Sequence, residues 1–481
     1  MEALASEITQ SGMDSFMNRS YTVDNANRLL KALIEKYQLQ KPSDAEALLN
    51  ELRLGVVCGE KIRSSAAFQS ALLTIVNTGK RAFLGGVFVS LPPYVELLVP
   101  WPECKSLNEV INKLGGKETK VNLDEMSFGL TIGCHSDRPN SLEILCNGWV
   151  GGVTSLPNYE VPLKPDFALG GVFAGALGVG CAFLRACGLD NTAAFKPMGF
   201  SLWKPNLNWL DPEASGPELI RIPKKIWVLG LGHLGQAYLW CLGLLSIPEI
   251  QQMEFMLQDF DSINKANLST GVLSEEDSLQ KLKTQNAADW LRSRKFNVKV
   301  TDRRFDNKTQ TNGDEPYVAL CGFDSLESRQ LLDEAGFDVI VECALGATLE
   351  NFDSFSMHVL PCSRSAKEIW AKHSSQKVEP AVVEAFEKEA EANNCGVIMA
   401  ARELAAKGIS SSFVGCVAAA VVISELIRAW HEGDGFESIK GQMRNLDISA
   451  VPATKPLNWA RNGYVGRVEM AKMELEKKTD L

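Results

Sequence analysis

The sequence lacks paired cysteines and a surplus of positive charge. Its 12 cysteines are scattered from Cys58 to Cys416, and no two stand as C-x-x-C. This spacing excludes the usual structural zinc knuckle and a disulfide framework, and it fits a reducing cytoplasm. The formal net charge is −10. Because phosphate neutralisation needs an excess of Lys and Arg, we expect no general nucleic-acid binder.

The sequence also has little that indicates a membrane or a secretory route. The N-terminus has no basic region followed by an apolar run, so we expect no secretory signal. One uncharged stretch, residues 167–184, is about long enough to span a bilayer. It contains five glycines and has no flanking aromatic belt. Because small residues let a helix press closely against its neighbour, we predict a buried helix and no membrane partner.

The chain of 481 residues is too long for one compact core. Residues 1–70 show helical spacing and predict a helical N-terminal segment. Residues 71–215 mix strand and helix patterns without a complete nucleotide motif, which predicts a second α/β lobe. Residues 216–440 predict the main lobe, and residues 441–481 predict a C-terminal tail.

The clearest pattern lies in the main lobe, where short apolar strands alternate with helices. Strands are predicted at 225–229, 254–260, 297–305, 317–321, 337–343 and 356–360. Helices are predicted at 234–245, 278–291 and 325–335. Apolar strands that alternate with helices indicate a parallel sheet covered on both faces. We therefore predict an α/β fold with a Rossmann-like, doubly wound, mostly parallel sheet.

A glycine motif and an acid pair follow the first two predicted strands of this lobe. Gly230-Leu-Gly232-His-Leu-Gly235 is a G-x-G-x-x-G between a strand and a helix, a turn whose free N–H groups can bind phosphate. Asp259 and Asp261 end the second strand, where an acid can bind a ribose hydroxyl. Asp259 follows Gly235 by 24 residues, which is close to the spacing of about 20 in dinucleotide enzymes. These features alone do not distinguish NAD, FAD and ATP.

The residues that follow resemble the family of ThiF, MoeB and the ubiquitin-activating enzymes. Residues 259–268 (DFDSINKANL) resemble its D-x-D-x-V-x-x-x-N-L run, and residues 280–283 (QKLK) resemble its helix-starting lysine. Residues 322–329 (GFDSLESR) resemble its T-D-N-x-x-x-R segment, and residues 408–415 (GISSSFVG) resemble its closing glycine-rich turn. The order and spacings agree over about residues 224–430.

The resemblance implies adenylation of a C-terminal carboxylate with ATP and Mg²⁺. A carboxylate that attacks the α-phosphate meets another negative group, so catalysis depends on cations and positioned donors. The resemblance implies that Asp324 would hold Mg²⁺ and that Asp261 would bind ribose. Asn267 and Lys283 would face the phosphates, with Lys283 offsetting charge on the transferred group. Each residue has another interpretation, because Lys283 would fit a solvated surface, Asp324 would fit a helix N-cap and Asp259 would simply end a strand.

The resemblance also implies the partners. The carboxylate would belong to the extended tail of a ubiquitin-like or sulfur-carrier protein, and a conjugating enzyme would be a further partner. Relatives work as dimers or fused pseudo-dimers, so residues 71–215 would be an inactive second adenylation lobe. This arrangement resembles bacterial ubiquitin-like conjugation systems linked to antiviral defence. We therefore expect a cytoplasmic adenylyltransferase.

One departure from the family weakens this interpretation. The family usually has N-L-x-R-Q, but Thr270 stands where the arginine is expected. Either another cation replaces it, such as Arg303, Arg304 or one from another chain, or adenylation is impaired.

The sequence also leaves two alternative functions open. One is an NAD(P)-dependent oxidoreductase, which leaves Lys283 and Asp324 without a role, and the other is a scaffold that keeps the fold without the activity.

Transfer of the activated carboxylate to a thiol would need a cysteine beyond the fourth strand. Cys343 lies in a predicted buried strand and Cys416 in an apolar helix, so both are expected in the core. Cys362 has Arg364 nearby, which would lower a thiol pKa. Cys395 lies in Asn-Asn-Cys-Gly between helices, which suits a nucleophile. We favour Cys395, with a bystander thiol as the alternative.

Overall fold

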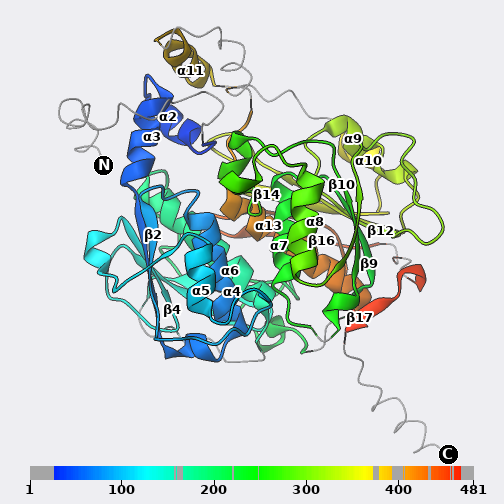
Figure 1. The fold of residues 1–481 in the computed structure, drawn as a ribbon, viewed down its shortest axis with the longest axis horizontal. Helices are drawn as coiled ribbons and strands as arrows, with labels where there is room; N and C mark the ends of the chain where they lie inside the picture. The colour runs from blue at the N-terminus through cyan, green and yellow to red at the C-terminus, as the bar shows by residue number, and fades with distance from the viewer. Residues whose placement is uncertain are drawn as a thin grey trace, which may run out of the picture.

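The computed structural model describes residues 27–466 apart from gaps at 157–158, 160–165, 219–220, 248, 372–378, 393–404, 406, 432–434, 455–456 and 458–459. These residues form two α/β lobes that lie side by side (Figure 1). A seven-stranded sheet builds the first lobe and an eight-stranded sheet builds the second. A short pair, β8 (Arg221–Pro223) with β17 (Tyr464–Gly466), lies beside the second sheet.

The first lobe has the strand order β3-β2-β1-β4-β5-β6-β7. Its strands are β1 (Arg53–Cys58), β2 (Gly86–Ser90), β3 (Lys117–Glu118), β4 (Phe128–Ile132), β5 (Ser141–Asn147), β6 (Val150–Thr154) and β7 (Met198–Ser201). Strands β1 to β5 pair in parallel, whereas β6 pairs antiparallel with both β5 and β7. Its main helices are α4 (Ala66–Gly79), α5 (Leu107–Lys113) and α6 (Ala168–Ala186).

The second lobe repeats this topology with one strand more, in the order β11-β10-β9-β12-β13-β14-β15-β16. Its strands are β9 (Lys225–Leu229), β10 (Glu254–Gln258), β11 (Asn297–Thr301), β12 (Val318–Cys321), β13 (Val339–Leu345), β14 (Ser354–Leu360), β15 (Phe436–Gln442) and β16 (Asp447–Pro452). Strands β9 to β13 pair in parallel. Each later strand pairs antiparallel with the one before it, from β13–β14 through β14–β15 to β15–β16. Its helices are α7 (His233–Gly243), α8 (Lys283–Ser293), α9 (Leu326–Gln330), α10 (Ala366–Ile369) and α13 (Ser412–Trp430). The predicted Rossmann-like sheet is confirmed.

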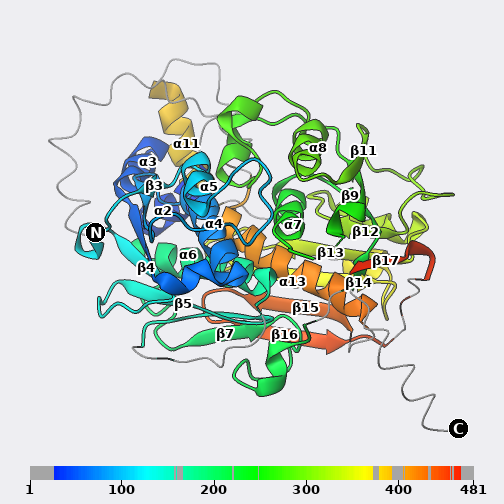
Figure 2. The same ribbon diagram turned by 60° about the horizontal axis from the view of Figure 1, so that its bottom comes forward.

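Buried helices join the two lobes. Helix α4 packs on α6, α6 packs on α13, and α13 packs on α7 (Figure 2). Both α6 and α13 are long and apolar enough to cross a membrane, but 94% of each apolar window is buried inside the protein. A Cβ on Gly171 would lie 1.9 Å from the Ala67 carbonyl oxygen, so the glycines of α6 allow its close contact with α4. The prediction of a buried helix at 167–184 is confirmed.

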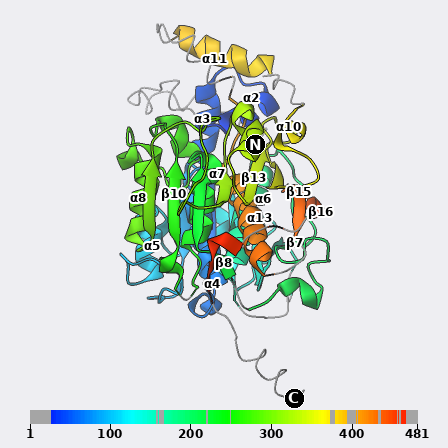
Figure 3. The ribbon, with the colours of Figure 1, turned by 90° about the vertical axis from the view of Figure 1, so that its right-hand side faces the viewer.

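Two parts of the chain differ from the sequence expectation. The segment 1–70, predicted to be helical, contains α2 (Leu30–Tyr37) and α3 (Pro42–Glu51), but its end forms β1 at the centre of the first sheet. A short apolar run such as LGVVC does not reveal by periodicity whether it is strand or helix. The predicted tail also contributes β16 to the second sheet. Helix α11 (Pro380–Ala392) packs on α2 at one end of the molecule (Figure 3).

Candidate functional site

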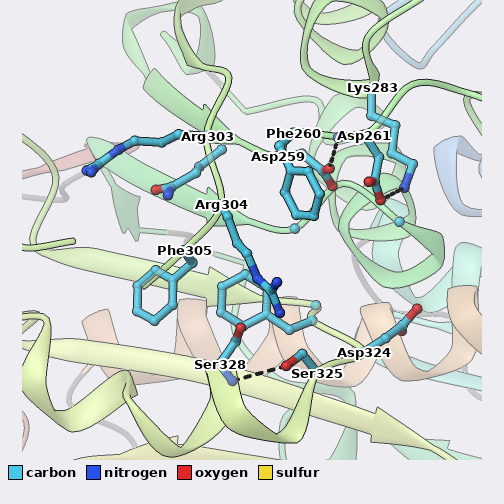
Figure 4. Close-up of a pocket in the computed structure, with 15 residues that line it drawn as sticks. Asp259, Phe260, Asp261, Lys283, Arg303, Arg304, Phe305, Asp324, Ser325 and Ser328 are labelled. Carbon is cyan, nitrogen blue, oxygen red and sulfur yellow. Dashed lines mark hydrogen bonds and ion pairs between the residues drawn. The ribbon is translucent and has the colours of Figure 1, made fainter. Parts of the chain in front are cut away.

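A pocket opens at the carboxyl ends of β9, β10 and β12, where the strand order of the second sheet reverses (Figure 4). Ligands of open α/β sheets bind at this switch point. The pocket is lined by Gly230, Gly232, Gln258, Asp259, Phe260, Asp261, Lys283, Arg303, Arg304, Phe305, Gly322, Phe323, Asp324, Ser325 and Ser328. The structure therefore brings together most of the residues that the sequence motifs indicate, while Gly235 and Asn267 lie outside the lining.

The glycine motif forms the turn from β9 to α7. Gly230 has a φ of +82°, a conformation that favours glycine. A Cβ on Gly235 would lie 2.0 Å from the Gly230 carbonyl oxygen, so Gly235 permits the helix to pack closely against the turn. A Cβ on Gly232 would meet nothing within 4 Å. Gly232 therefore keeps open the space in front of the α7 N-terminus, which favours an anion such as phosphate.

The two aspartates after β10 have different partners. Asp259 accepts the Leu231 N–H at 2.6 Å through Oδ2 and the Asp261 N–H at 2.9 Å through Oδ1. Asp261 instead accepts the Lys283 Nζ at 2.7 Å through Oδ2. Asp259 thus fixes the backbone of the glycine turn, while the half-exposed Asp261 carboxylate is available at the pocket wall.

Lys283 is the first residue of α8 and is buried, with 10% of its side chain exposed. Its own N–H donates to the Asp261 carbonyl at 2.9 Å, which holds the start of α8 against the end of β10. The interpretation of Lys283 as a solvated surface lysine is wrong, since its ammonium group lies against Asp261 in the pocket (Figure 4).

Asp324 follows β12 on the opposite side of the pocket from Lys283 (Figure 4). The N-cap of α9 is Ser325, whose side chain accepts the Ser328 N–H at 3.2 Å. The interpretation of Asp324 as the helix cap is therefore wrong. Within the described residues, no three His, Cys, Asp or Glu side chains cluster as a metal site. Mg²⁺ is commonly held by one or two carboxylates together with phosphate oxygens, and Asp324 would be such a carboxylate.

The turn that contains Asn267 is held from the first lobe. Asn267 Oδ1 accepts the Asn264 N–H at 3.0 Å, which forms one half of a capping box. Arg81, which follows the end of α4, donates to the carbonyls of Leu268 and Ser274 just beyond Asn267. Thr270 is buried within this turn, with 3% exposed, so it cannot replace the expected arginine.

Arg28, which precedes α2, was not identified from the sequence. Its backbone N–H lies 3.5 Å from Ser269 Oγ, and its Nε is buried without a hydrogen-bond partner among the described residues. Burial lowers the pKa of Arg28, and the Asp324 carboxylate opposes this shift. No motif surrounds Arg28, and the contact with Ser269 spans 241 residues, so no local signal could have found it.

His233 does more than separate glycines. Its Nδ1 lies 2.9 Å from Ser410 Oγ, and a Cβ on Gly415 would lie 2.2 Å from its Nε2. Burial lowers the pKa of His233 to about 3, so the ring is neutral near pH 7. The ring therefore joins the glycine turn to the start of α13.

The candidate thiols differ from expectation in one case. Cys343 and Cys416 are fully buried, and burial raises the pKa of both thiols, as expected for core residues. Cys362 is 8% exposed, and burial raises its pKa more than the nearby Arg364 lowers it. The expectation of a lowered thiol pKa at Cys362 is therefore wrong. Cys395 lies outside the described residues.

Comparison with known proteins separates the same two lobes. The BilD N-terminal domain model matches residues 53–202, and the BilD C-terminal domain model matches residues 222–433. Over 436 residues the chain is 35% identical to the bacterial E1-like protein BilD of Collimonas sp. (strain OK412), covering 89% of this chain and 94% of that protein. The chain belongs to the BilD family of bacterial E1-like proteins.

Other similarities are shorter or weaker. The catalytic subunit of the NEDD8-activating enzyme E1 of Caenorhabditis elegans is 30% identical over 129 residues. The match covers 26% of this chain and 29% of that subunit. Two crystal structures of E. coli MccB, the first of them described as MccB with MccA-N7isoASN, match with TM-scores of 0.33 and 0.32. The first is 14% identical and the match covers 48% of this chain and 64% of the MccB chain. The second is 13% identical and the match covers 65% of this chain and 92% of the MccB chain. Scores this low do not establish a common fold. The resemblance to E1 enzymes is confirmed by the BilD relative.

Proposed function

We propose that the second lobe adenylates the C-terminal carboxylate of a ubiquitin-like or sulfur-carrier protein, using ATP and Mg²⁺. The observation that carries this proposal is the convergence of the glycine turn, Asp261, Lys283 and Asp324 in one pocket. These residues come from separate segments at the ends of neighbouring strands. Together they provide phosphate-binding N–H groups, a ribose acceptor, a buried cation and an oxygen ligand.

Each residue has a distinct role in this proposal. The N–H groups at the α7 N-terminus bind phosphate, and Asp261 accepts a ribose hydroxyl. Lys283 moves from Asp261 towards the phosphates and offsets negative charge as the carboxylate approaches. Asp324 holds the magnesium ion, which supplies charge neutralisation at the phosphate oxygens. Asp259 binds no ligand in this account, because one of its oxygens accepts from the Leu231 N–H of the glycine turn and the other from the Asp261 N–H.

Arginines of the same chain would replace the missing family arginine at Thr270. Arg303 and Arg304 line the pocket, and the Arg304 guanidinium lies 6.0 Å from the Phe260 ring centroid. Arg28, outside the lining, would add a further positive charge that Asp324 stabilises. The number of nearby cations supports a triphosphate ligand, and no arginine from another chain is needed.

The first lobe would be an inactive adenylation lobe, so that the chain is an internal pseudo-dimer. Its strand order matches that of the second lobe, but residues 59–63 (GEKIR) replace the glycine motif between β1 and α4. We also propose that the Cys395 thiol attacks the acyl adenylate to form a thioester with release of AMP, that a conjugating enzyme then accepts the acyl group from Cys395, and that the cytoplasmic pathway serves antiviral defence. Membership of the bacterial E1-like family supports this sequence of steps.

ATP–pyrophosphate exchange in the presence of the ubiquitin-like partner tests the proposal. We expect exchange that requires Mg²⁺ and is lost in Asp324→Ala. Exchange unaffected by Asp324→Ala would remove this residue from the metal site, and no exchange in the native protein would favour a scaffold. A linkage to the partner that reductant cleaves should disappear in Cys395→Ala, and its persistence would exclude this thiol.

Thermal shift separates adenylation from the NAD(P)-dependent alternative. We expect ATP with Mg²⁺ to raise the unfolding midpoint and NAD(H) or NADP(H) to leave it unchanged, because a ligand stabilises only the state that binds it. Stabilisation by a dinucleotide alone would favour the oxidoreductase.

A further inference from the structure

A buried arginine holds the peptide group immediately before Asp324. Arg329 of α9 is 5% exposed, and its Nε and Nη2 donate to the Phe323 carbonyl at 3.0 Å and 2.5 Å. Its Nη2 also donates to the Cys343 carbonyl at 2.9 Å on β13. Because the peptide group is planar, fixing the Phe323 oxygen also fixes the position of the Asp324 nitrogen.

A second layer of buried groups orients Arg329. Glu342 on β13 is fully buried and accepts from Arg329 Nη1 and, at 2.6 Å, from His358 Nδ1. Trp370, which follows α10, packs against the Arg329 guanidinium and the His358 ring. Its ring centroid lies 4.5 Å from the Arg329 guanidinium carbon and 5.5 Å from the His358 ring centroid.

Stability alone does not account for this arrangement. Taking an Arg–Glu pair out of water carries a desolvation penalty that its attraction often fails to exceed, so a buried ion pair is weak evidence for stabilisation. Two of the arginine's hydrogen bonds end on the Phe323 carbonyl, which lies in the pocket lining beside Asp324. The direction of these bonds indicates control of the Asp324 backbone.

We propose that Arg329 is a positioning residue that sets Asp324 for the magnesium ion, and that Glu342, His358 and Trp370 hold Arg329 in place. The inference rests on the proposed function, since it takes Asp324 as the metal ligand. Arg329 acts through Asp324 and touches neither nucleotide nor metal. The same group links α10, beyond β14, to the floor of the nucleotide pocket.

A matched control lies elsewhere in the chain. Arg428 of α13 is 1% exposed, donates to the carbonyls of Leu202 and Trp203 at 2.7 Å and 2.9 Å, and pairs with the buried Glu425. It therefore has the same burial, the same kind of carbonyl partners and the same counter-charge as Arg329. It joins α13 to the first lobe and is absent from the pocket lining.

Calorimetric titration of the full chain with ATP, in excess Mg²⁺ and in excess EDTA, tests the inference. The quantity of interest is the ratio of the two dissociation constants. We expect Mg²⁺ to strengthen ATP binding by the native protein. In Arg329→Lys, which keeps the charge but loses the fork of donors, we expect this strengthening to fall by about 10-fold or more, as for other residues that orient metal ligands. ATP binding in EDTA should not change.

The control and a second variant make every outcome informative. Arg428→Lys should lower the unfolding temperature without changing the Mg²⁺ ratio. If Arg329→Lys does not fold, the double variant Arg329→Met with Glu342→Gln removes both charges together, which proteins often tolerate. A native Mg²⁺ ratio in either folded Arg329 variant overturns the inference. Absence of ATP binding by the native protein would instead refute the proposed function.

Discussion

Asp259 and Asp261 lie two residues apart, yet their carboxylates have different hydrogen-bond partners. The Asp259 oxygens accept backbone N–H groups, whereas Asp261 faces the pocket and pairs with Lys283. The sequence motif predicted both as nucleotide ligands, because spacing does not reveal which oxygens are already occupied. At the residue scale, only the observed hydrogen bonds separate a structural acid from a binding acid.

Substitution of these two acids should separate stability from binding. Asp259→Asn removes a charged acceptor from the glycine turn and should cost about 1–3 kcal/mol of unfolding free energy. Asp261→Asn breaks a half-exposed ion pair and should cost no more than about 1 kcal/mol, while weakening ATP binding. Denaturant unfolding and ATP titration measure the two effects. Equal loss of stability in both variants would contradict the assignment.

Arg28 should matter for catalysis despite its distance along the chain. Arg28→Gln removes a cation near Asp324 and should lower the rate of pyrophosphate exchange by about 10²-fold, the typical effect of losing one transition-state donor. Lys36→Gln removes a charge from an exposed position of α2 and serves as the control. Equal rates in the two variants would show that Arg28 does not serve the pocket.

At the element scale, the central strands of the second sheet could be predicted because they are continuous apolar runs. The prediction for 225–229 coincides with β9, and the prediction for 254–260 extends two residues past β10. Helix α8 begins later than predicted, at Lys283, because the preceding residues pair Ser262 with Leu282 instead. Strand β16 (DISAVP) was missed because it lies at the sheet edge with none of its residues buried, and so lacks a continuous apolar run.

The turn from β9 to α7 allows a test with two glycines of one motif. Gly235→Ala places a methyl group 2.0 Å from the Gly230 carbonyl oxygen, so it should destabilise the fold by about 1–3 kcal/mol, as overpacking does. Gly232→Ala meets no atom within 4 Å and should leave stability unchanged while reducing ATP affinity. Thermal unfolding and ATP titration distinguish them. A large stability loss in Gly232→Ala would contradict the placement of the open space.

At the scale of the whole molecule, the two lobes share one topology but supply different parts of the site. The second lobe carries the motifs that the sequence reveals. The first lobe supports the turn after Asn267 through Arg81, and the backbone of Arg28, from a segment before both sheets, contacts Ser269 of the same turn. Neither arginine could be predicted, because contacts across 187 and 241 residues leave no periodic pattern.

The same arrangement predicts that the lobes act together. Arg81→Met leaves two carbonyls of the turn without their side-chain donor and removes one of the two cations that pair with Glu275, the other being Lys80. We expect it to lower stability by about 1–3 kcal/mol, as when buried carbonyls lose their hydrogen-bond donor, and to weaken ATP binding. Arg63→Met, at a more exposed position in the first lobe, should change neither. Native ATP affinity in folded Arg81→Met would show that the second lobe works independently.

A crystal structure of the full chain with ATP and Mg²⁺ tests the central claim most directly. We expect the triphosphate to lie over the glycine turn, with Asp324 at the magnesium ion and Lys283 turned from Asp261 to the phosphates. A structure in which Asp324 points away from the phosphates, and Lys283 remains on Asp261 or in solvent, would contradict the account.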